Sequence, residues 1–184
     1  RRMNFIREFS PYFTEAYRAV AGVSEPIELR YEPDALPPGI ADHSPSLSEI
    51  EAEYTAVAKR RKIEEMRRGV TVFGAQKDDL YIGINGGNAR EFASQGQHKS
   101  LLIALKTGEF EYLRAAKDEM PIMLFDDIFS ELDAARTGRV FQNIIRSKAQ
   151  TFITTTESES LRKAIPEGVQ SAFFRVVSGV IERI

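Results

Sequence analysis

The sequence lacks cysteine altogether and is poor in histidine, with only His43 and His98 among its 184 residues. The absence of cysteine excludes disulfides and thiolate metal sites, and it agrees with a reducing cytoplasm. With so few histidines we expect neither a histidine-rich metal site nor a Ser–His catalytic pair. No stretch approaches the roughly 18 apolar residues of a membrane span, so we expect no membrane partner.

A further absence concerns nucleotide chemistry. The chain contains no G-x-x-x-x-G-K-[ST] phosphate loop. Its net charge is only −2, so any contact with nucleic acid must come from a local basic patch. A hydrophobic content of 42% and a charged content of 28% are typical of one folded domain, with room for a small subdomain.

What the chain does carry is an apolar run that ends in two carboxylates, Pro121-Ile-Met-Leu-Phe-Asp126-Asp127. A continuous apolar run is typical of a buried parallel strand, so we expect residues 122–125 in the core. Ligand chemistry in open α/β sheets gathers at the carboxyl ends of strands. Asp126 is therefore placed to hold a nucleotide's magnesium, with Asp127 beside the attacking water. This pattern indicates a Walker B strand rather than an ordinary loop, because two carboxylates at the end of a buried strand are costly without a partner.

A second motif, Ser94-Gln95-Gly96-Gln97, opens a predicted helix over 97–116. A serine hydroxyl and free N–H groups at a helix N-terminus form an anion site. Gly96 lets the backbone approach a phosphate closely. The alternative is that Ser94 is only the N-cap of this helix.

The remaining pattern predicts helices, strands and turns on both sides of Gly69. We expect a helix over 4–21 with a break or kink at Ser10-Pro11, a strand over 27–31 and a loop over 33–45. A second helix is expected to run to about Arg68 and to end at Gly69. Its cap is Ser46 or Ser48, and Glu49 lies three residues after Ser46, as in a capping box. After this helix we expect strands over 70–73, 78–84 and 88–92 with a turn at Asn85-Gly86-Gly87, then a strand over 121–126, a helix over 131–147, a strand over 150–155 and a hairpin of 172–177 and 180–184. Alternating strands and helices predict an α/β fold with a parallel sheet.

Several of these segments resemble known motifs. Ser94 to Gln97 resembles the signature motif of ABC-type ATPase heads, Asp126-Asp127 resembles their Walker B, and Ser130-Glu-Leu-Asp133 resembles their D-loop. The amino-acid sequences of residues 92–97, 126–133 and 152–156 are most similar to those of the RecF family of bacterial recombination mediators. The resemblance implies the C-terminal lobe of an ABC ATPase head over 70–184, a small and mainly helical subdomain over 1–69, and a Walker A lobe that is absent from this sequence.

The resemblance also implies roles for single residues. Ser94, Gln95, Gly96 and Gln97 are expected to act in trans, on ATP held by a partner subunit. Asp126 is expected to hold Mg²⁺ through water, and Asp127 to orient the attacking water.

Further along the chain, Thr156 is expected to sense the γ-phosphate, and Ser130 and Asp133 to cross the dimer interface. Two alternatives stay open. Ser130 and Asp133 also match a capping box, and Thr154 to Thr156 also suit a plain strand end.

The implied partners are double-stranded DNA and gapped DNA, RecR and RecO, and a second copy of the protein bound through ATP, with loading of RecA as the outcome. The whole protein is expected to be a slow DNA-dependent ATPase, and this chain to be inactive alone without Walker A. Lys59, Arg60, Arg61 and Lys62 form the basic cluster that could contact DNA. The alternative is that these cations only complement the dipole at a helix C-terminus.

Two other functions are considered. One is another SMC-like or overcoming-lysogenization-type ATPase head, although residues 1–69 carry prolines and no heptad repeat. The other is a non-catalytic interaction module. Two departures from the usual motifs are also present: Asp127 stands where most ABC heads have glutamate, and Gly74-Ala-Gln-Lys-Asp-Asp79 replaces the Gly-Pro-His-Arg-Asp-Asp that is usual in RecF.

Overall fold

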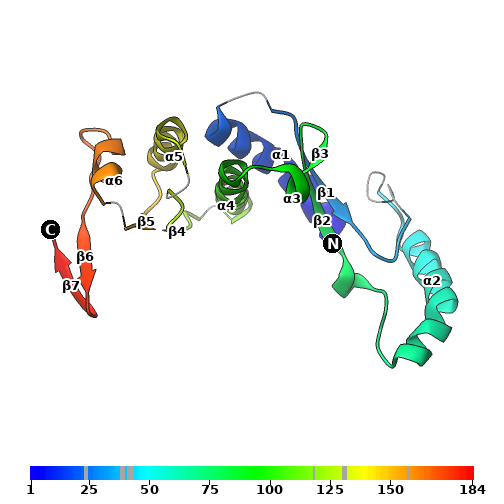
Figure 1. The fold of residues 1–184 in the computed structure, drawn as a ribbon. Coiled ribbons are helices and arrows are strands. Elements are labelled where there is room, and N and C mark those ends of the chain that lie inside the picture. The colour runs from blue at the N-terminus through cyan, green and yellow to red at the C-terminus, as the bar shows by residue number, and fades with distance from the viewer. Residues whose placement is uncertain (23–24, 38–39, 41–43, 118, 130–131, 157) are drawn as a thin grey trace.

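The computed structural model describes residues 1–22, 25–37, 40, 44–117, 119–129, 132–156 and 158–184. Along the chain the helices and strands are α1 (Arg2–Ala21), β1 (Ile27–Glu32), α2 (Leu47–Arg68), a 3₁₀ turn (Ala75–Lys77), β2 (Asp79–Ile84), β3 (Gly87–Asn88), α3 (Ala89–Phe92), α4 (Gln95–Lys117), β4 (Met123–Asp126), α5 (Ala134–Ser147), β5 (Thr151–Thr154), α6 (Ser158–Ala164), β6 (Phe174–Val177) and β7 (Val180–Arg183). They follow an arch, with α2 at one end and the β6–β7 hairpin at the other (Figure 1). The predicted α/β class is confirmed.

α1 is one helix, so of the predicted break or kink at Ser10-Pro11 the break is wrong. Pro11 lies inside it, on the exposed side. An interior proline removes a backbone hydrogen bond and costs about 3 kcal/mol. Phe9, Phe13 and Tyr17 are nevertheless buried in one continuous stripe on both sides of Pro11. Packing of this stripe therefore outweighs the local preference of proline.

β1, β2 and β3 form an antiparallel sheet against α1. β1 pairs with β2 from Ile27↔Ile84 to Glu32↔Asp79, so a strand before Gly69 and a strand after it share one ladder. The predicted turn is confirmed, because Asn85 and Gly86 take φ 51° and 80°, as a type I′ hairpin requires. The predicted strand over 88–92 ends instead at Asn88, whose side chain accepts the Arg90 N–H at 3.0 Å and starts α3.

The first core joins α1 to α4. It contains buried side chains from both sides of Gly69: Ile6, Phe9, Phe13, Tyr17, Ala21, Leu29, Ile84, Ala89, Leu101 and Ala104. The two helices cross closely at Gly108, where an added Cβ would lie 3.1 Å from the backbone of Phe13. Glycine therefore permits this close crossing, because a side chain would need the backbone of Phe13 to move by a few tenths of an ångström.

β4 and β5 are parallel neighbours, with Met123↔Thr151 to Asp126↔Thr154 in register. Met123 and Phe125 belong to a second core with side chains of α1, α4 and α5. The prediction that residues 122–125 all lie in the core is wrong for two of them, since Ile122 is 59% and Leu124 72% exposed. Among the described residues this sheet is covered on one face only, which leaves the alternate side chains outside.

α2 begins with the predicted capping box, in which Ser46 accepts from the Glu49 N–H and Glu49 accepts from the Ser46 N–H. It ends at Gly69, with φ 66°. The predicted strand over 70–73 is wrong. Arg61 of α2 donates a hydrogen bond to the Val72 carbonyl, and Glu65 of α2 accepts one from the Val72 N–H. These two backbone groups are therefore not available to pair with a neighbouring strand.

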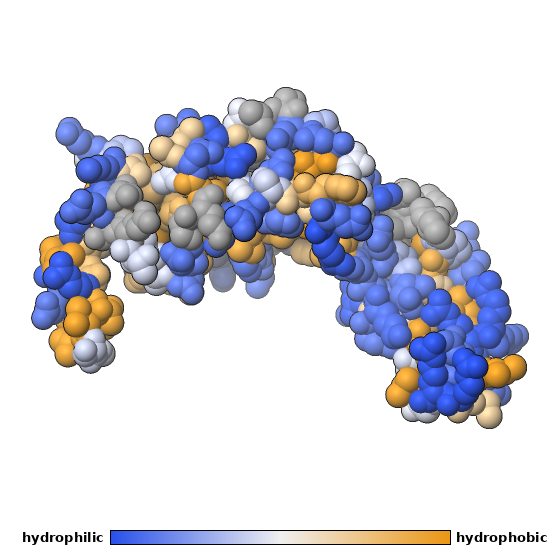
Figure 2. Space-filling view, viewed as in Figure 1, coloured by the Kyte–Doolittle hydropathy of each residue, from blue (hydrophilic) through white to orange (hydrophobic). Residues whose placement is uncertain are grey.

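The β6–β7 hairpin turns at Ser178-Gly179, as predicted. Its apolar side chains are exposed on both faces: Phe174, Val176, Val177, Val180 and Ile181. Figure 2 shows them as an apolar surface at the end of the arch. Within the described ranges, no helix is long and apolar enough to cross a bilayer.

Candidate functional site

The carboxyl end of β4 carries the two predicted acids, and both are exposed. The parallel register sets Asp126 opposite Thr154 at the end of β5. The Thr154 hydroxyl donates a hydrogen bond to the Asp126 carboxylate. The strand ends therefore bring an acid and a hydroxyl together at the sheet edge where ligands of open α/β sheets bind.

Asp127 begins a sharp turn away from the strand. Its φ is 46°, in the left-handed region. Its N–H lies 3.2 Å from both the carbonyl and the hydroxyl oxygen of Thr154. Thr154 thus contacts both acids, whereas Thr156 lies exposed beyond the end of β5. Sequence reasoning proposed Thr156 and gave no role to Thr154, although the pairing of parallel strand ends could have indicated it.

The donors at this edge suit a hydrated magnesium ion. Mg²⁺ prefers oxygen ligands and usually keeps several waters, so one or two protein oxygens suffice. Asp126 and Thr154 supply a carboxylate and a hydroxyl oxygen. Among the described residues, no group of three or more His, Cys, Asp or Glu side chains could hold a metal.

The signature motif opens α4, a helix of 23 residues. Ser94 Oγ accepts the Gln97 N–H at 3.2 Å, and Gln97 Oε1 accepts the Ser94 N–H at 2.9 Å. This reciprocal pair is a capping box, so Ser94 is indeed a helix cap. Ser94 and Gln95 are nevertheless exposed. Capping and anion binding are therefore compatible here.

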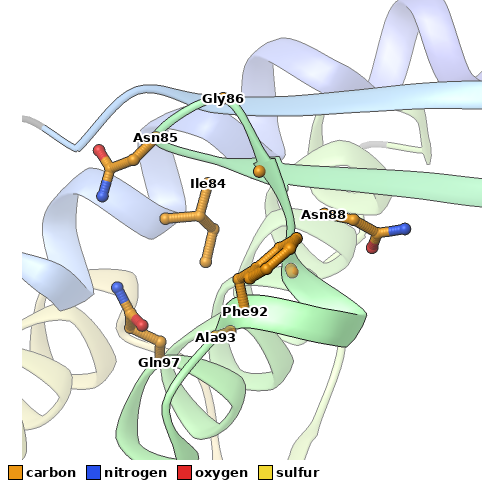
Figure 3. A pocket seen from close by; sticks show the side chains of 9 residues that line it. Ile84, Asn85, Gly86, Asn88, Phe92, Ala93 and Gln97 are labelled. Carbon is orange, nitrogen blue, oxygen red and sulfur yellow. The ribbon is translucent and has the colours of Figure 1, made fainter.

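A cavity of about 390 Å³ borders the signature motif. Figure 3 shows Ile84, Phe92 and Gln97 around it, each from a different element. Phe92 is 74% exposed. The motif therefore lies beside a concave and partly apolar surface.

The D-loop prediction is described only at Asp133, because Ser130 lies outside the described residues. Asp133 is the N-cap of α5 and accepts the Arg136 N–H at 2.8 Å. This hydrogen bond, together with the nearby Arg136 guanidinium, holds the pKa of Asp133 below its ordinary value. Its carboxylate is therefore charged and exposed at neutral pH.

The basic cluster of α2 divides into two kinds of residue. Arg61 donates to the Val72 carbonyl at 3.0 Å and lies 3.9 Å from the carboxylate of Asp34, so it holds the fold together. Lys59, Arg60 and Lys62 are exposed. These three side chains are the members of the cluster placed to meet an anionic partner.

Comparison with known proteins identifies relatives of this chain. It is 37% identical to the DNA replication and repair protein RecF of Chloroherpeton thalassium over 181 residues, which are 97% of this chain and 47% of the relative. It is 36% identical to the RecF protein of Geobacter metallireducens over 182 residues, 98% of this chain and 48% of the relative. Over the residues that it spans, the chain is similar to RecF proteins. It spans about half the length of these curated relatives.

Solved structures show the same fold as this chain. A structure of the recombination mediator RecF with ATP, from the RecFOR pathway, matches with a TM-score of 0.74 at 22% identity, over 98% of this chain and 44% of that one. An SMC head bound to the C-winged helix domain of ScpA matches with a TM-score of 0.53 at 18% identity, over 99% and 43%. These likenesses concern the fold alone. No protein-family model matches the chain.

Asp78 was not predicted from the sequence to have a role. Its side chain is 2% exposed and accepts from the Tyr31 hydroxyl, from Arg2 at 3.2 Å and from the Asp34 N–H at 3.0 Å. Burial, followed by the bond to Asp78, raises the pKa of Tyr31 to about 12. Asp78 thus joins α1, the end of β1 and the start of β2.

Proposed function

We propose that this chain is the C-terminal part of a RecF-like, ATP-dependent DNA-binding protein that acts in recombinational repair and replication restart. Residues 70–184 would form the C-terminal lobe of an ATPase head, and residues 1–69 a smaller and mainly helical subdomain. The observation that carries this proposal is the exposure of both motifs. Ser94 and Asp126 stand at the surface, where a nucleotide shared between two subunits could reach them.

The proposed chemistry divides among the named residues. Asp126, with Thr154 beside it, would hold Mg²⁺ through water, and Asp127 would orient the attacking water. The magnesium ion would neutralise charge on the phosphates. Ser94 and the N-terminus of α4 would bind the γ-phosphate of ATP held by a second subunit, because hydroxyl and N–H donors at a helix N-terminus favour anions.

Apolar surfaces support a covering lobe that carries the phosphate loop. Ile122, Leu124 and Phe152 lie exposed on the open face of β4–β5, and both faces of the β6–β7 hairpin are apolar. A two-stranded ribbon of this kind is at best marginally stable by itself. Since the relatives are about twice as long, we propose that their additional part covers these faces and supplies Walker A.

The proposed partners follow from the family. They are duplex and gapped DNA, RecR and RecO, with loading of RecA at single-strand gaps as the outcome in the cytoplasm. We propose Thr156 as a sensor of the γ-phosphate, and Ser130 and Asp133 as parts of the dimer interface.

Substitutions in a full-length protein that carries this chain test the enzymatic proposal. Ser94→Arg should abolish ATP-dependent dimerisation in sedimentation experiments, and Asp126→Ala should abolish ATP turnover. Thr71→Arg is the control, because it adds the same charge at an exposed loop residue. If dimerisation and turnover both survive in the two site variants, the chain acts instead as an interaction module.

A separate experiment tests contact with DNA. Reversing Lys59, Arg60 and Lys62 to glutamate, with Arg61 kept because it supports the fold, should weaken duplex binding. The slope of log K against log salt should also fall by about 0.9 for each phosphate contact that is lost. Reversals at the exposed residues Lys106, Lys117 and Lys163 serve as controls. An unchanged salt slope would assign the cluster to helix capping.

A further inference from the structure

One carboxylate, that of Glu25, ties the signature motif to the end of α1. The Tyr17 hydroxyl donates to Glu25 Oε2 at 2.6 Å, and Gln97 Nε2 donates to Glu25 Oε1 at 3.3 Å. Tyr17 is fully buried. This burial, followed by the bond to Glu25, raises the pKa of Tyr17, so the phenol remains a donor. Each oxygen of the carboxylate therefore has its own donor.

Glu25 fixes the orientation of the Gln97 side-chain amide. A glutamine amide has two orientations of nearly the same shape, which exchange its donor and acceptor ends. Only the NH₂ end can face a carboxylate favourably. The oxygen end is then left to accept the Ser94 N–H, at 2.9 Å. The opposite orientation would set an NH₂ group against that N–H and an oxygen against the carboxylate.

The orientation of Gln97 in turn fixes how Ser94 is presented. The backbone N–H of Gln97 donates to Ser94 Oγ at 3.2 Å, so the serine oxygen is used as an acceptor within the motif. The hydroxyl hydrogen can then donate outward from the exposed N-terminus of α4. We propose that Glu25 is a positioning residue that locks the signature so that Ser94 presents its hydroxyl to the partner's γ-phosphate. This inference rests on the proposed function.

The end of α1 that bears this link is itself anchored. Arg139 of α5 donates to the carbonyl groups of Val20 and Ala21, at 2.8 Å each. The adjoining Gly22 has φ 69°, and an added Cβ there would lie 2.5 Å from Arg139 Nε. The end of α1 is thus held against the helix that Asp133 caps. A preorganised site of this kind avoids the cost of ordering its donors during binding.

Glu25→Gln in the full-length protein tests the proposal. An amide at position 25 cannot accept from both Tyr17 and Gln97 through two oxygens, so one donor loses its partner. We expect ATP-dependent dimerisation, measured by sedimentation, to weaken about tenfold, because each dimer contains two such sites. ATP affinity of the single subunit should stay within about twofold, since the signature acts in trans. Glu28→Gln, a half-exposed neighbour on β1, is the matched control.

Exchanging the hydrogen-bond donor and acceptor between positions 25 and 97 distinguishes a positioning role of Glu25 from a general effect on stability. In Gln97→Glu two carboxylates face each other, whereas the double variant E25Q/Q97E restores one donor and one acceptor. The double variant should dimerise more tightly than Gln97→Glu alone. Absence of this rescue would overturn the role of Glu25, and the comparison remains valid if Glu25→Gln folds poorly.

The controls distinguish this inference from the function on which it rests. If Ser94→Arg prevents dimerisation while Glu25→Gln dimerises like the wild type, the positioning role is wrong and the proposed function stands. If the wild-type protein does not dimerise with ATP at all, the proposed function fails together with the inference.

Discussion

Two pairs of adjacent aspartates, Asp78-Asp79 and Asp126-Asp127, stand at strand ends in very different surroundings. The side chain of Asp78 is almost completely buried among hydrogen-bond donors. Asp79 forms a bidentate ion pair with the Arg90 guanidinium, with N···O distances of 2.9 and 3.2 Å. Asp126 and Asp127 are exposed. Among the described residues, Asp126 is bound by the hydroxyl of Thr154 and forms no ion pair.

The difference shows how the surroundings of a carboxylate indicate whether its role is structural or functional. Asp78 accepts hydrogen bonds from Arg2, Tyr31 and the Asp34 N–H, and the exposed Asp79 pairs with Arg90 of α3, so the charge of both acids is used in contacts within the fold. A hydroxyl at the carboxyl end of a parallel strand leaves Asp126 free to interact with a cation from solution. The first pair is therefore expected to control stability and the second to control nucleotide chemistry.

The largest effect is expected from Asp126→Asn in the full-length protein. ATP turnover should fall at least about 100-fold, because electrostatic stabilisation by the metal dominates phosphoryl transfer. The free energy of unfolding should change by less than about 0.5 kcal/mol, as for most surface substitutions. Turnover assays and urea unfolding measure the two quantities. A large loss of stability with normal turnover would reverse the assignment of the two pairs.

Asp78→Asn should have the opposite signature. It weakens a buried acceptor of several hydrogen bonds, and we expect the free energy of unfolding to fall by about 2–3 kcal/mol. Turnover per folded molecule should remain normal. Urea unfolding at pH 7, with the exposed Asp126→Asn as control, measures the difference. Equal stability of the two variants would contradict the comparison.

Thr154→Val sharpens the second half of the comparison. The variant keeps the shape of the side chain but removes the hydroxyl that contacts Asp126 and Asp127. We expect turnover to fall about tenfold, the size of one lost hydrogen bond to a charged group. Thr154→Ser keeps the hydroxyl and should retain most of the activity. The prediction fails if valine and serine behave alike.

The smallest effect is expected from the pH dependence of Asp79. The hydrogen bond from Arg90 holds the pKa of Asp79 below its ordinary value. A lowered folded-state pKa contributes stability that is present above the unfolded pKa and is lost as pH falls through the folded value. Wild type should therefore exceed Asp79→Asn in stability near pH 6, and the gap should close below about pH 4. A gap that widens in acid would show the opposite shift.

Local signals in the sequence were sufficient for much of the fold. Ser46 with Glu49, Gly69 and the Asn85-Gly86 turn were predicted because their backbone chemistry is contained within a few residues. The strand assigned to 70–73 was wrong because the partners of Val72 are Arg61 and Glu65, on a helix rather than a strand. Such pairing depends on tertiary contacts that a hydrophobic pattern does not record.

The sequence predicted the motifs of the candidate site but not the residues that hydrogen-bond to those motifs. Asp126 and Ser94 could be found from strand and helix termini, and both are exposed. Thr154, at the end of β5, could have been found from the pairing of parallel strand ends, whereas the contacts of Glu25 join residues that no local pattern connects. Ile122 and Leu124 were predicted to be buried but are exposed in this chain, because a sheet covered on one face and a sheet covered on both faces have the same apolar run.

The left-handed backbone at Asp127 has a practical consequence for capturing the assembled state. Aspartate and asparagine enter this conformation more readily than longer side chains, so the turn itself favours the shorter acid over the glutamate of most ABC heads. Asp127→Asn should leave the turn intact and remove the charge that we propose orients the attacking water, whereas Asp127→Gln would strain the turn. The asparagine variant is therefore the better choice for trapping an unhydrolysed complex for imaging.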